Sequence, residues 1–328
     1  MKDLRALAPP ERAALVAFLE RTNLQSDHPS LPEPQHLAVT GRAEPPRGER
    51  VVLAHRGAEL AGFAVLSPTR DGGTEVHLVT DAVSASASVS AIPSGSSGSS
   101  TPSTPSGPSD LASALLQRAV EAASPASPLH LWIMQATADD DARVATLGFA
   151  PARDLLQMRV ALPLPDEVVG ATRPLRTRAF VPGRDEEAWV ETNNRAFADH
   201  PEQGDWTVAQ LRERMAADWV DLDGFLVADD PDGDGLIGAC WTKVHRDRSP
   251  VLGEIYVIDV DPKHHGQGWG RSLTVAGLVH LAGRGIGVGM LYTDASNTAA
   301  VALYRSLGFI VDHVDRSYIS DSGAARQP

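Results

Sequence analysis

Two hydrophobic periods alternate along this chain. Short runs of apolar and β-branched residues, typical of strands, are separated by segments in which apolar residues recur every three or four positions, as on one face of a helix. Residues 11–22 show the helical period, because Ala14, Leu15, Phe18 and Leu19 fall on one side. The pattern predicts an α/β protein. The expected helices are 11–22, 111–123, 142–147, 184–197, 208–218, 271–282 and 297–307, and the expected strands are 50–54, 60–66, 74–80, 129–135, 155–162, 224–229, 236–245, 254–260, 289–294 and 309–319.

The order of these elements repeats. Each half ends with a short helix followed by Leu-Gly-Phe, at residues 147–149 and again at 307–309. We interpret this as a tandem duplication of one α/β unit. The predicted domains are 1–165 and 172–320, and residues 321–328 are expected to form a flexible tail.

A tract rich in Ser, Gly, Pro and Ala interrupts the first half at about residues 84–109. Such a composition buries too little apolar surface to offset the entropy of ordering, so we predict disorder. Asp110 is then a suitable N-cap for the helix 111–123. Deletion of residues 87–108 is expected to leave activity almost unchanged.

Composition narrows the function classes. The 328 residues are 42% hydrophobic, which is enough for packed cores, and the formal net charge of −13 argues against binding to nucleic acid or to anionic membranes. Cys240 is the single cysteine, in an apolar run, so we expect a buried thiol and a reducing, cytoplasmic location. The N-terminal segment reads as an amphipathic helix and not as a signal peptide, and no apolar run is long enough to span a membrane. We expect a monomer.

The most informative stretch is residues 254–271. A β-branched strand ends at Asp261-Pro262, because proline cannot continue the ladder, and glycine then occupies positions 266, 268 and 270 before a helix. Glycines and a helix N-terminus together make a cradle for phosphate or pyrophosphate. The spacing is neither that of a dinucleotide fingerprint nor that of a Walker loop. A glycine-rich turn without a ligand is the alternative.

Two further residues could carry acid–base chemistry. Glu254 opens the strand before the loop and is a candidate general base, and a solvent-exposed edge glutamate is the alternative. Tyr304 lies seven residues after Asn297, so the two are expected to share a helix face, and a buried structural tyrosine is the alternative. No metal site is predicted, because the neighbours His264 and His265 cannot easily face one ion. The acidic segment 230–235 reads as a plain hairpin turn.

These motifs resemble those of the GNAT acyltransferases. The match comprises Val260-Asp261-Pro262, the three glycines, and Asn-x-x-Ala-x-x-Leu-Tyr-x-x-x-Gly-Phe from Asn297 to Phe309, with His265 where the family usually has Arg or Gln. The resemblance implies two tandem GNAT domains, each a mixed, mostly antiparallel sheet flanked by helices, with the second catalytic. It also implies acetyl-CoA as co-substrate, Glu254 as base and Tyr304 as the acid that protonates the CoA thiolate. The residues implied to bind acetyl-CoA are Ile258, Asp259, Val260, His265, Gly266, Gln267, Gly268, Trp269, Gly270, Arg271, Asn297, Thr298, Ala299, Ala300, Val301 and Ala302. Since the first half has the Ser/Gly tract in place of the loop, it should bind CoA weakly or not at all.

Within this superfamily the second half resembles the mycothiol synthases, which are also tandem proteins. The similarity lies in residues 200–204, 241–245 and 253–257, and in Leu291-Tyr292. It implies acetyl transfer to the cysteinyl amine of desacetylmycothiol (Cys-GlcN-Ins). The implied substrate residues are Asp27, Glu202, Lys243, Glu254 and Tyr292. The alternatives are an N-acetyltransferase of another amine and a non-catalytic acyl-CoA sensor, although a sensor would not need Glu254 and Tyr304 together.

Overall fold

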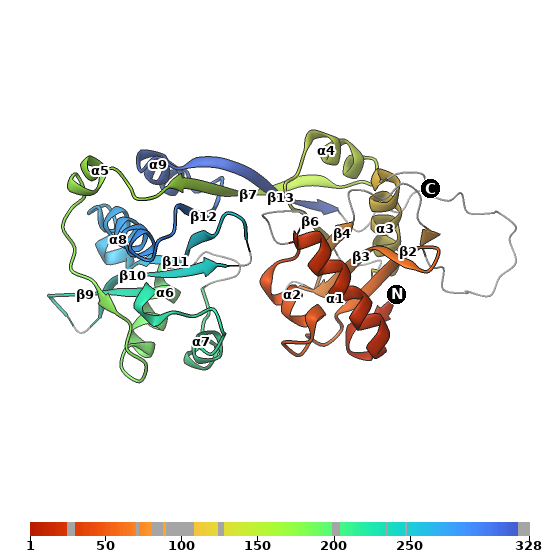
Figure 1. Ribbon diagram of the computed structural model, residues 1–328, viewed down its shortest axis with the longest axis horizontal. Coiled ribbons are helices and arrows are strands. Elements are labelled where there is room, and N and C mark those ends of the chain that lie inside the picture. The colour runs from red at the N-terminus through yellow and green to blue at the C-terminus, as the bar shows by residue number, and fades with distance from the viewer. Residues whose placement is uncertain are drawn as a thin grey trace, which may run out of the picture. The chain divides into compact units, whose positions relative to one another are not determined.

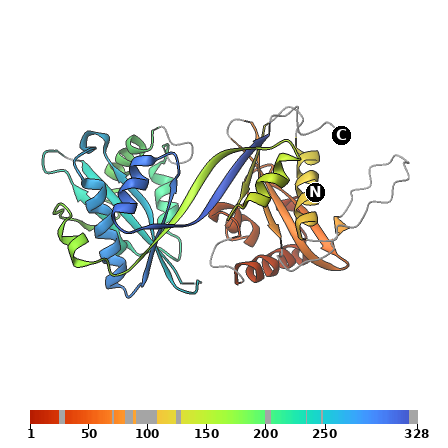
Figure 2. The same cartoon turned by 90° about the horizontal axis from the view of Figure 1, so that it is seen from above.

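The chain packs into two compact units, Met1–Leu155 with His313–Pro328, and Leu156–Asp312. The computed structural model describes residues 1–24, 30–69, 72–80, 88–89, 108–123, 128–198, 204–233, 235–246 and 248–320. Two long strands, β7 (Ala150–Ala161) and β13 (Ile310–Ser320), each begin in one unit and end in the other (Figure 2).

The first unit is a sheet in the order β1-β2-β3-β4-β6, with the C-terminal half of β13 beside β6 (Figure 1). The sheet is antiparallel except where β4 and β6 pair in parallel. Its elements are β1 (Lys2–Asp3), η1 (Leu4–Ala6), α1 (Pro9–Leu24), α2 (Glu33–Thr40), β2 (Arg50–Arg56), β3 (Glu59–Pro68), β4 (Thr74–Thr80), β5 (Ser88–Val89), α3 (Pro108–Ala122), β6 (Leu129–Ile133), α4 (Ala138–Ala145) and the start of β7.

Each face of this sheet has its own apolar core. Residues of α3, among them Leu111, Leu115 and Ala119, pack on one face. Phe18 and Leu19 of α1 and residues of α2 pack on the other. Successive side chains of a strand point to opposite faces of the sheet. Because helices cover both faces, apolar side chains are found on each of them.

The second unit repeats this order. Its sheet runs β12-β11-β10-β9-β8, with the second half of β7 beside β12, and β11 and β12 pair in parallel. Its elements are α5 (Asp166–Gly170), β8 (Arg178–Ala179), α6 (Glu186–Ala196), α7 (Val208–Met215), η2 (Leu222–Gly224), β9 (Phe225–Asp229), β10 (Leu236–His245), β11 (Leu252–Val260), η3 (Pro262–His264), α8 (Trp269–Gly283), β12 (Val288–Asp294) and α9 (Thr298–Ser306), followed by the start of β13.

Helices also cover both faces of the second sheet (Figure 1). Trp189 of α6 and Leu211 of α7 join Phe225, Trp241 and strand neighbours in a core on one face. On the other face α8 lies so close that a Cβ added to its Gly277 would stand 2.5 Å from Cys240 Sγ. This close approach explains the glycine, and it buries the thiol as expected.

The strand register supports the duplication in detail. Glu75 in β4 lies opposite Ser67 of β3 and His130 of β6, and Glu254 in β11 lies opposite Lys243 of β10 and Met290 of β12. In both units the glutamate is at the start of the parallel pairing with the next strand. Glu75 is therefore the internal counterpart of Glu254.

Several expectations need correction. Residues 313–320 pack with the first unit and residues 156–161 with the second, because β7 and β13 cross from one unit to the other, so the units differ from the predicted ranges 1–165 and 172–320. Asp110 is no N-cap, since α3 already begins at Pro108. The helices α2 and α5 were not predicted; Pro32 and Pro165 stand at their N-caps.

The predicted disordered tract and the predicted tail at 321–328 lie largely or wholly outside the described residues. Within the tract, Ser88–Val89 form β5, which pairs with Ala54 and His55 of β2, and Pro108 and Ser109 already belong to α3. For the rest of the tract disorder stays a prediction. In the part of the chain that is described, no helix has the length and apolar character needed to cross a membrane.

Candidate active site

The candidate site lies along β11, on the face of the second sheet that α6 and α7 also cover. Glu254 is the third residue of β11 and is buried. Because residues directly opposite in a sheet share a face, Lys243 and Met290 lie on the same side as Glu254, and Tyr292 follows two positions after Met290. The fold thus brings Glu254, Lys243 and Tyr292 to one face of the sheet from three neighbouring strands.

Pairing between β11 and β12 is short. Only Gly253↔Gly289 and Glu254↔Met290 are ladder partners in these two strands, all of whose residues are described. Beyond Glu254 the edge of β11 therefore presents backbone groups that β12 does not pair. Such an edge can accept an extended ligand as an added strand.

A β-bulge shapes the same strand. Trp241 pairs with Val257 and Thr242 pairs with Ile255, so β11 has one extra residue, Tyr256. As a result Tyr256 and Val257 both join the aromatic core on the α6 face, while Ile255 points to α8. Tyr256, two residues after Glu254, thus lies on the same face of the sheet as Glu254.

His245 contacts the candidate base directly. Its ring nitrogen Nε2 lies 2.7 Å from Glu254 Oε2, and an imidazole N–H at this distance donates a hydrogen bond to the carboxylate. His245 is two residues after Lys243 on β10, which puts both side chains on one face. His245 was not predicted as a site residue, although it lies in the matched segment 241–245 and two residues after Lys243, and both were available signals.

Lys243 is held against aromatic rings. Its ammonium lies 4.4 Å from the ring centre of Trp219 and 5.2 Å from that of Tyr256. A cation over a ring face is attracted by the ring quadrupole. These contacts place a positive charge on the face that carries Glu254, which favours anionic or electron-rich groups of a substrate and disfavours a second cation.

Tyr292 is positioned from the first half of the sequence. Gln157 on β7 donates from Nε2 to the Tyr292 hydroxyl at 2.8 Å, and Arg159 Nε donates to Gln157 Oε1 at 2.8 Å. Since arginine only donates, it determines which end of the Gln157 amide faces Tyr292. Arg159 is in turn 3.3 Å from Asp312. Gln157 could not be found from the sequence, because its strand was assigned to the other domain.

The glycine loop has the backbone geometry of an anion cradle. Gly266 and Gly268 have φ angles of 73° and 86°, in the left-handed region that only glycine adopts easily. Gly268 is the N-cap of α8 and supplies no side-chain cap, so the first N–H groups of the helix point outward without one. No atom lies within 4 Å of a Cβ built on either glycine, which leaves room for a phosphate group at the loop. These residues fit the pyrophosphate of acetyl-CoA.

The side chains around the loop mostly support it. His265 donates from Nε2 to the Val260 carbonyl at 2.9 Å, closing the end of β11. Arg173 donates to the Gln267 carbonyl at 3.0 Å and stacks 3.6 Å from the Trp269 ring centre. Arg271 bonds Thr172 and Ser306. His265 and Arg271 thus have protein partners in addition to their predicted role toward the cofactor.

Asp259 has a buried environment that the sequence did not indicate. Its Oδ2 accepts a hydrogen bond from Trp189 Nε1 at 3.1 Å, and its Oδ1 is buried with no partner among the described residues. Burial raises the pKa of Asp259 to about 8. Only its backbone, with that of Ile258 and Val260, is therefore suited to the cofactor role.

Asn297 and Tyr304 mark the two ends of α9. Asn297 is the N-cap, and its side-chain oxygen accepts from the Ala300 N–H at 3.1 Å, so it stands before the helix and not on its face. Thr298, Ala299, Ala300, Val301 and Ala302 form the first turns. Tyr304 is buried beside Phe309, and burial raises its pKa to about 12. It therefore keeps its proton at neutral pH and can donate it.

Two predicted substrate residues cannot be placed. Asp27 and Glu202 lie outside the described residues, as does most of the segment 200–204.

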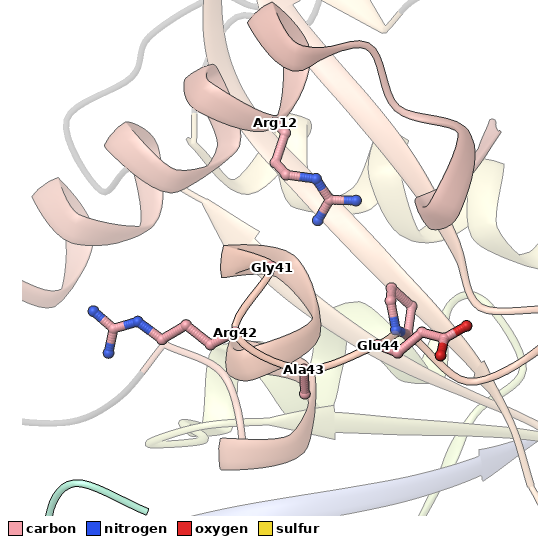
Figure 3. A pocket seen from close by; sticks show the side chains of 6 residues that line it. Arg12, Gly41, Arg42, Ala43 and Glu44 are labelled. Atoms are coloured by element: carbon pink, nitrogen blue, oxygen red, sulfur yellow. The ribbon is translucent and has the colours of Figure 1, made fainter.

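A pocket in the first unit is lined by Arg12, Arg42 and residues of the turn after α2 (Figure 3). None of its lining residues was predicted to bind the substrate or acetyl-CoA. Arg12 donates to the carbonyls of Leu4, Ala38 and Val39, so its charge serves the local fold.

Comparison with known proteins agrees with this geometry. Residues 187–309 match the model of the acetyltransferase (GNAT) family. A mycothiol acetyltransferase of Thermobispora bispora is 37% identical over 94% of this chain and 96% of its own length. The chain belongs to the mycothiol acetyltransferase family. A second member, from Thermomonospora curvata, is 39% identical over 96% of this chain and 95% of its own.

Solved structures support the fold of this family member. A tandem GNAT protein from the clavulanic acid biosynthesis pathway matches with a TM-score of 0.63 at 14% identity, covering 96% of each chain. A GCN5-related N-acetyltransferase from Sphaerobacter thermophilus gives 0.60 at 20% identity, covering 97% of this chain and 95% of its own. The predicted tandem GNAT architecture is confirmed.

Proposed function

We propose that the protein transfers the acetyl group of acetyl-CoA to the cysteinyl amine of Cys-GlcN-Ins, giving mycothiol and CoA. The observation that carries this proposal is the position of Glu254. This residue is buried, accepts a hydrogen bond from His245, and lies beside Lys243 and Tyr292 at the point where the pairing between β11 and β12 ends. Family membership supplies the substrate. We further propose a monomeric, cytoplasmic enzyme that needs no metal.

The co-substrate would be held mainly by backbone. The loop from His265 to Arg271 and the N-terminus of α8 suit the pyrophosphate, and the edge of β11 at Ile258, Asp259 and Val260, which β12 does not pair, suits the pantetheine arm. Asn297 and residues 298–302 would flank the arm from α9. Backbone donors carry no net charge, which explains how a chain of net charge −13 can hold an anionic ligand.

The chemistry divides between two side chains. Glu254 takes a proton from the attacking ammonium, the nitrogen forms a bond to the acetyl carbon, and the carbon–sulfur bond breaks. Tyr304 donates a proton to the thiolate. The second proton lost by the nitrogen then restores the Tyr304 hydroxyl. The ammonium thus loses two protons, one to sulfur and one to Glu254 and then to solvent.

The substrate groups match the side chains present. A cysteinylated sugar–inositol conjugate offers one amine and many hydroxyls. Glu254 suits the amine, and Lys243 and Tyr292 suit hydroxyl or carbonyl oxygens. Asp27 and Glu202 would complete this set.

The test is acetyl transfer by the purified full-length protein from acetyl-CoA to Cys-GlcN-Ins, followed by product mass and the position of the new acetyl group. We expect one added acetyl group, on nitrogen. An unmodified amine, with acetyl-CoA still bound in calorimetry, would overturn the substrate assignment.

Glu254→Gln should keep acetyl-CoA affinity and lower turnover on the order of 10²–10⁴-fold, the usual contribution of a general base. Glu75→Gln is the matched control, because Glu75 has the same register in the first unit. Its turnover should stay near that of the wild type. Equal effects of the two substitutions would remove Glu254 from the role of base.

A further inference from the structure

The contact between His245 and Glu254 has the features of a built pair. Among the described residues, His245 is the hydrogen-bond partner of the Glu254 carboxylate, through Oε2 alone. The side chains are 20% and 10% exposed, so the hydrogen bond is largely shielded from water. The two residues come from different strands, β10 and β11, which pair with each other in the sheet.

We propose that His245 is a positioning residue for Glu254 and selects which carboxylate oxygen receives the amine proton. This inference rests on the proposed function. The N–H at Nε2 holds Oε2, which leaves Oε1 as the oxygen that accepts the amine proton. Oε1 then releases that proton to solvent, and the hydrogen bond from Nε2 to Oε2 stays in place. The overall change is one proton released for each amide formed.

A hydrogen-bonded imidazole and carboxylate gain and lose protons as a pair, so a substitution at either residue should change the pH dependence of the reaction. Other charged or titratable groups on this face are Lys243 on β10, Tyr256 on β11 and Tyr292 on β12. Of these, Lys243 is a base whose side-chain nitrogen lies over the rings of Trp219 and Tyr256.

The first unit contains a useful comparison. There His77 Nε2 lies 3.1 Å from Glu75, so a glutamate of the same register again has an imidazole neighbour, although from its own strand. His77 is almost fully buried, with 3% of its surface exposed, and it belongs to the unit without the candidate base. His77→Gln is therefore a control for His245→Gln, since it removes an imidazole beside a glutamate of the same register.

The experiment measures kcat against pH for the full-length wild type, His245→Gln, His245→Leu and His77→Gln, with acetyl-CoA affinity as a check on folding. Glutamine can still donate to Oε2 but cannot titrate. We expect its acid limb to move down by about one pH unit or more, toward that of a lone carboxyl group. His245→Leu should lose tenfold or more of kcat at pH 8, part of the roughly 10²–10⁴-fold that a general base contributes. His77→Gln should keep the wild-type profile.

An unchanged acid limb in His245→Gln, or wild-type kcat in His245→Leu, would overturn the proposal. A second readout does not depend on turnover: NMR titration of the His245 ring in wild type and in Glu254→Gln. A midpoint that falls in the variant supports the coupled pair, and an identical midpoint overturns it. If the wild type fails to acetylate Cys-GlcN-Ins, the proposed function falls, and the NMR titration alone decides whether the pair is coupled.

Discussion

At the scale of single residues, burial changes the chemistry of groups that the sequence shows only by type. Tyr304 and Cys240 are both buried, and desolvation raises the pKa of each. Asp259 is the extreme case, because one of its oxygens has no partner within the described part of the chain. Its charge would be costly, so the folded protein favours the protonated form.

Asp259 should make stability depend on pH. Its pKa is about 8 in the folded protein and near 4 in the unfolded chain, so between these values the folded state binds more protons. The contribution of Asp259 to the free energy of unfolding is fully present below about pH 4 and is lost as the pH rises toward 8. Asp259→Asn should flatten the fall of melting temperature between pH 5 and pH 7 relative to wild type. The same slope in both proteins would contradict the assignment, and Asp229→Asn, at an exposed carboxylate, is the control.

At the scale of elements, two devices prepare the site: the loop before α8 and the strand β7. The loop depends on glycine conformation, since Gly268 has positive φ and open space around its missing Cβ. The strand β7 acts through its position, since it brings Gln157 to Tyr292 although the two residues are 135 positions apart in the sequence.

Gly268→Ala should weaken acetyl-CoA binding through strain in the loop, because alanine resists positive φ at a cost of about 1–2 kcal/mol. Gly183 is a matched control, with φ 83° and equally open surroundings, in the turn before α6. Gly183→Ala should lose similar stability and keep acetyl-CoA affinity, as measured by calorimetry. Equal affinities in the two variants would show that the loop tolerates the change.

Gln157→Leu should raise KM for the amine substrate and leave acetyl-CoA affinity unchanged, because the Tyr292 hydroxyl loses a donor of about 0.5–1.5 kcal/mol. A double-mutant cycle with Tyr292→Phe checks the route. If Gln157 acts through the hydroxyl, adding Gln157→Leu to Tyr292→Phe has little further effect. Strictly additive effects would place the action of Gln157 elsewhere.

At the scale of the whole molecule, the two units share strands, and sequence halves and packed units do not coincide. The unit that holds the candidate site begins at Leu156 and ends at Asp312, so it needs the second half of β7. A protein cut at the apparent boundary near residue 172 loses the strand next to β12, together with Gln157 and Arg159.

A fragment beginning at residue 172 should therefore be less stable and less active than one beginning at residue 150, since it exposes an unpaired strand edge. Thermal unfolding and acetyl-transfer assays of both fragments check this, with the full chain as reference. Equal stability and activity of the two fragments would show that β7 is dispensable for the second unit.

The sequence by itself determined the longer helices and strands of the second half, though not α5 or β8, and the glycine loop, the duplication and the family. These are local features, because glycine spacing, a proline after a strand and apolar periodicity each depend on a few consecutive residues and can be recognised in the sequence. It also indicated Glu254, Lys243 and Tyr292, through resemblance. Only the tertiary structure decided that Asn297 is a cap, that Asp259 is buried, and that His245 and Gln157 join the site. Those facts depend on strand register and on pairing between distant segments, which set side-chain neighbours and solvent exposure but leave no periodic trace in the chain.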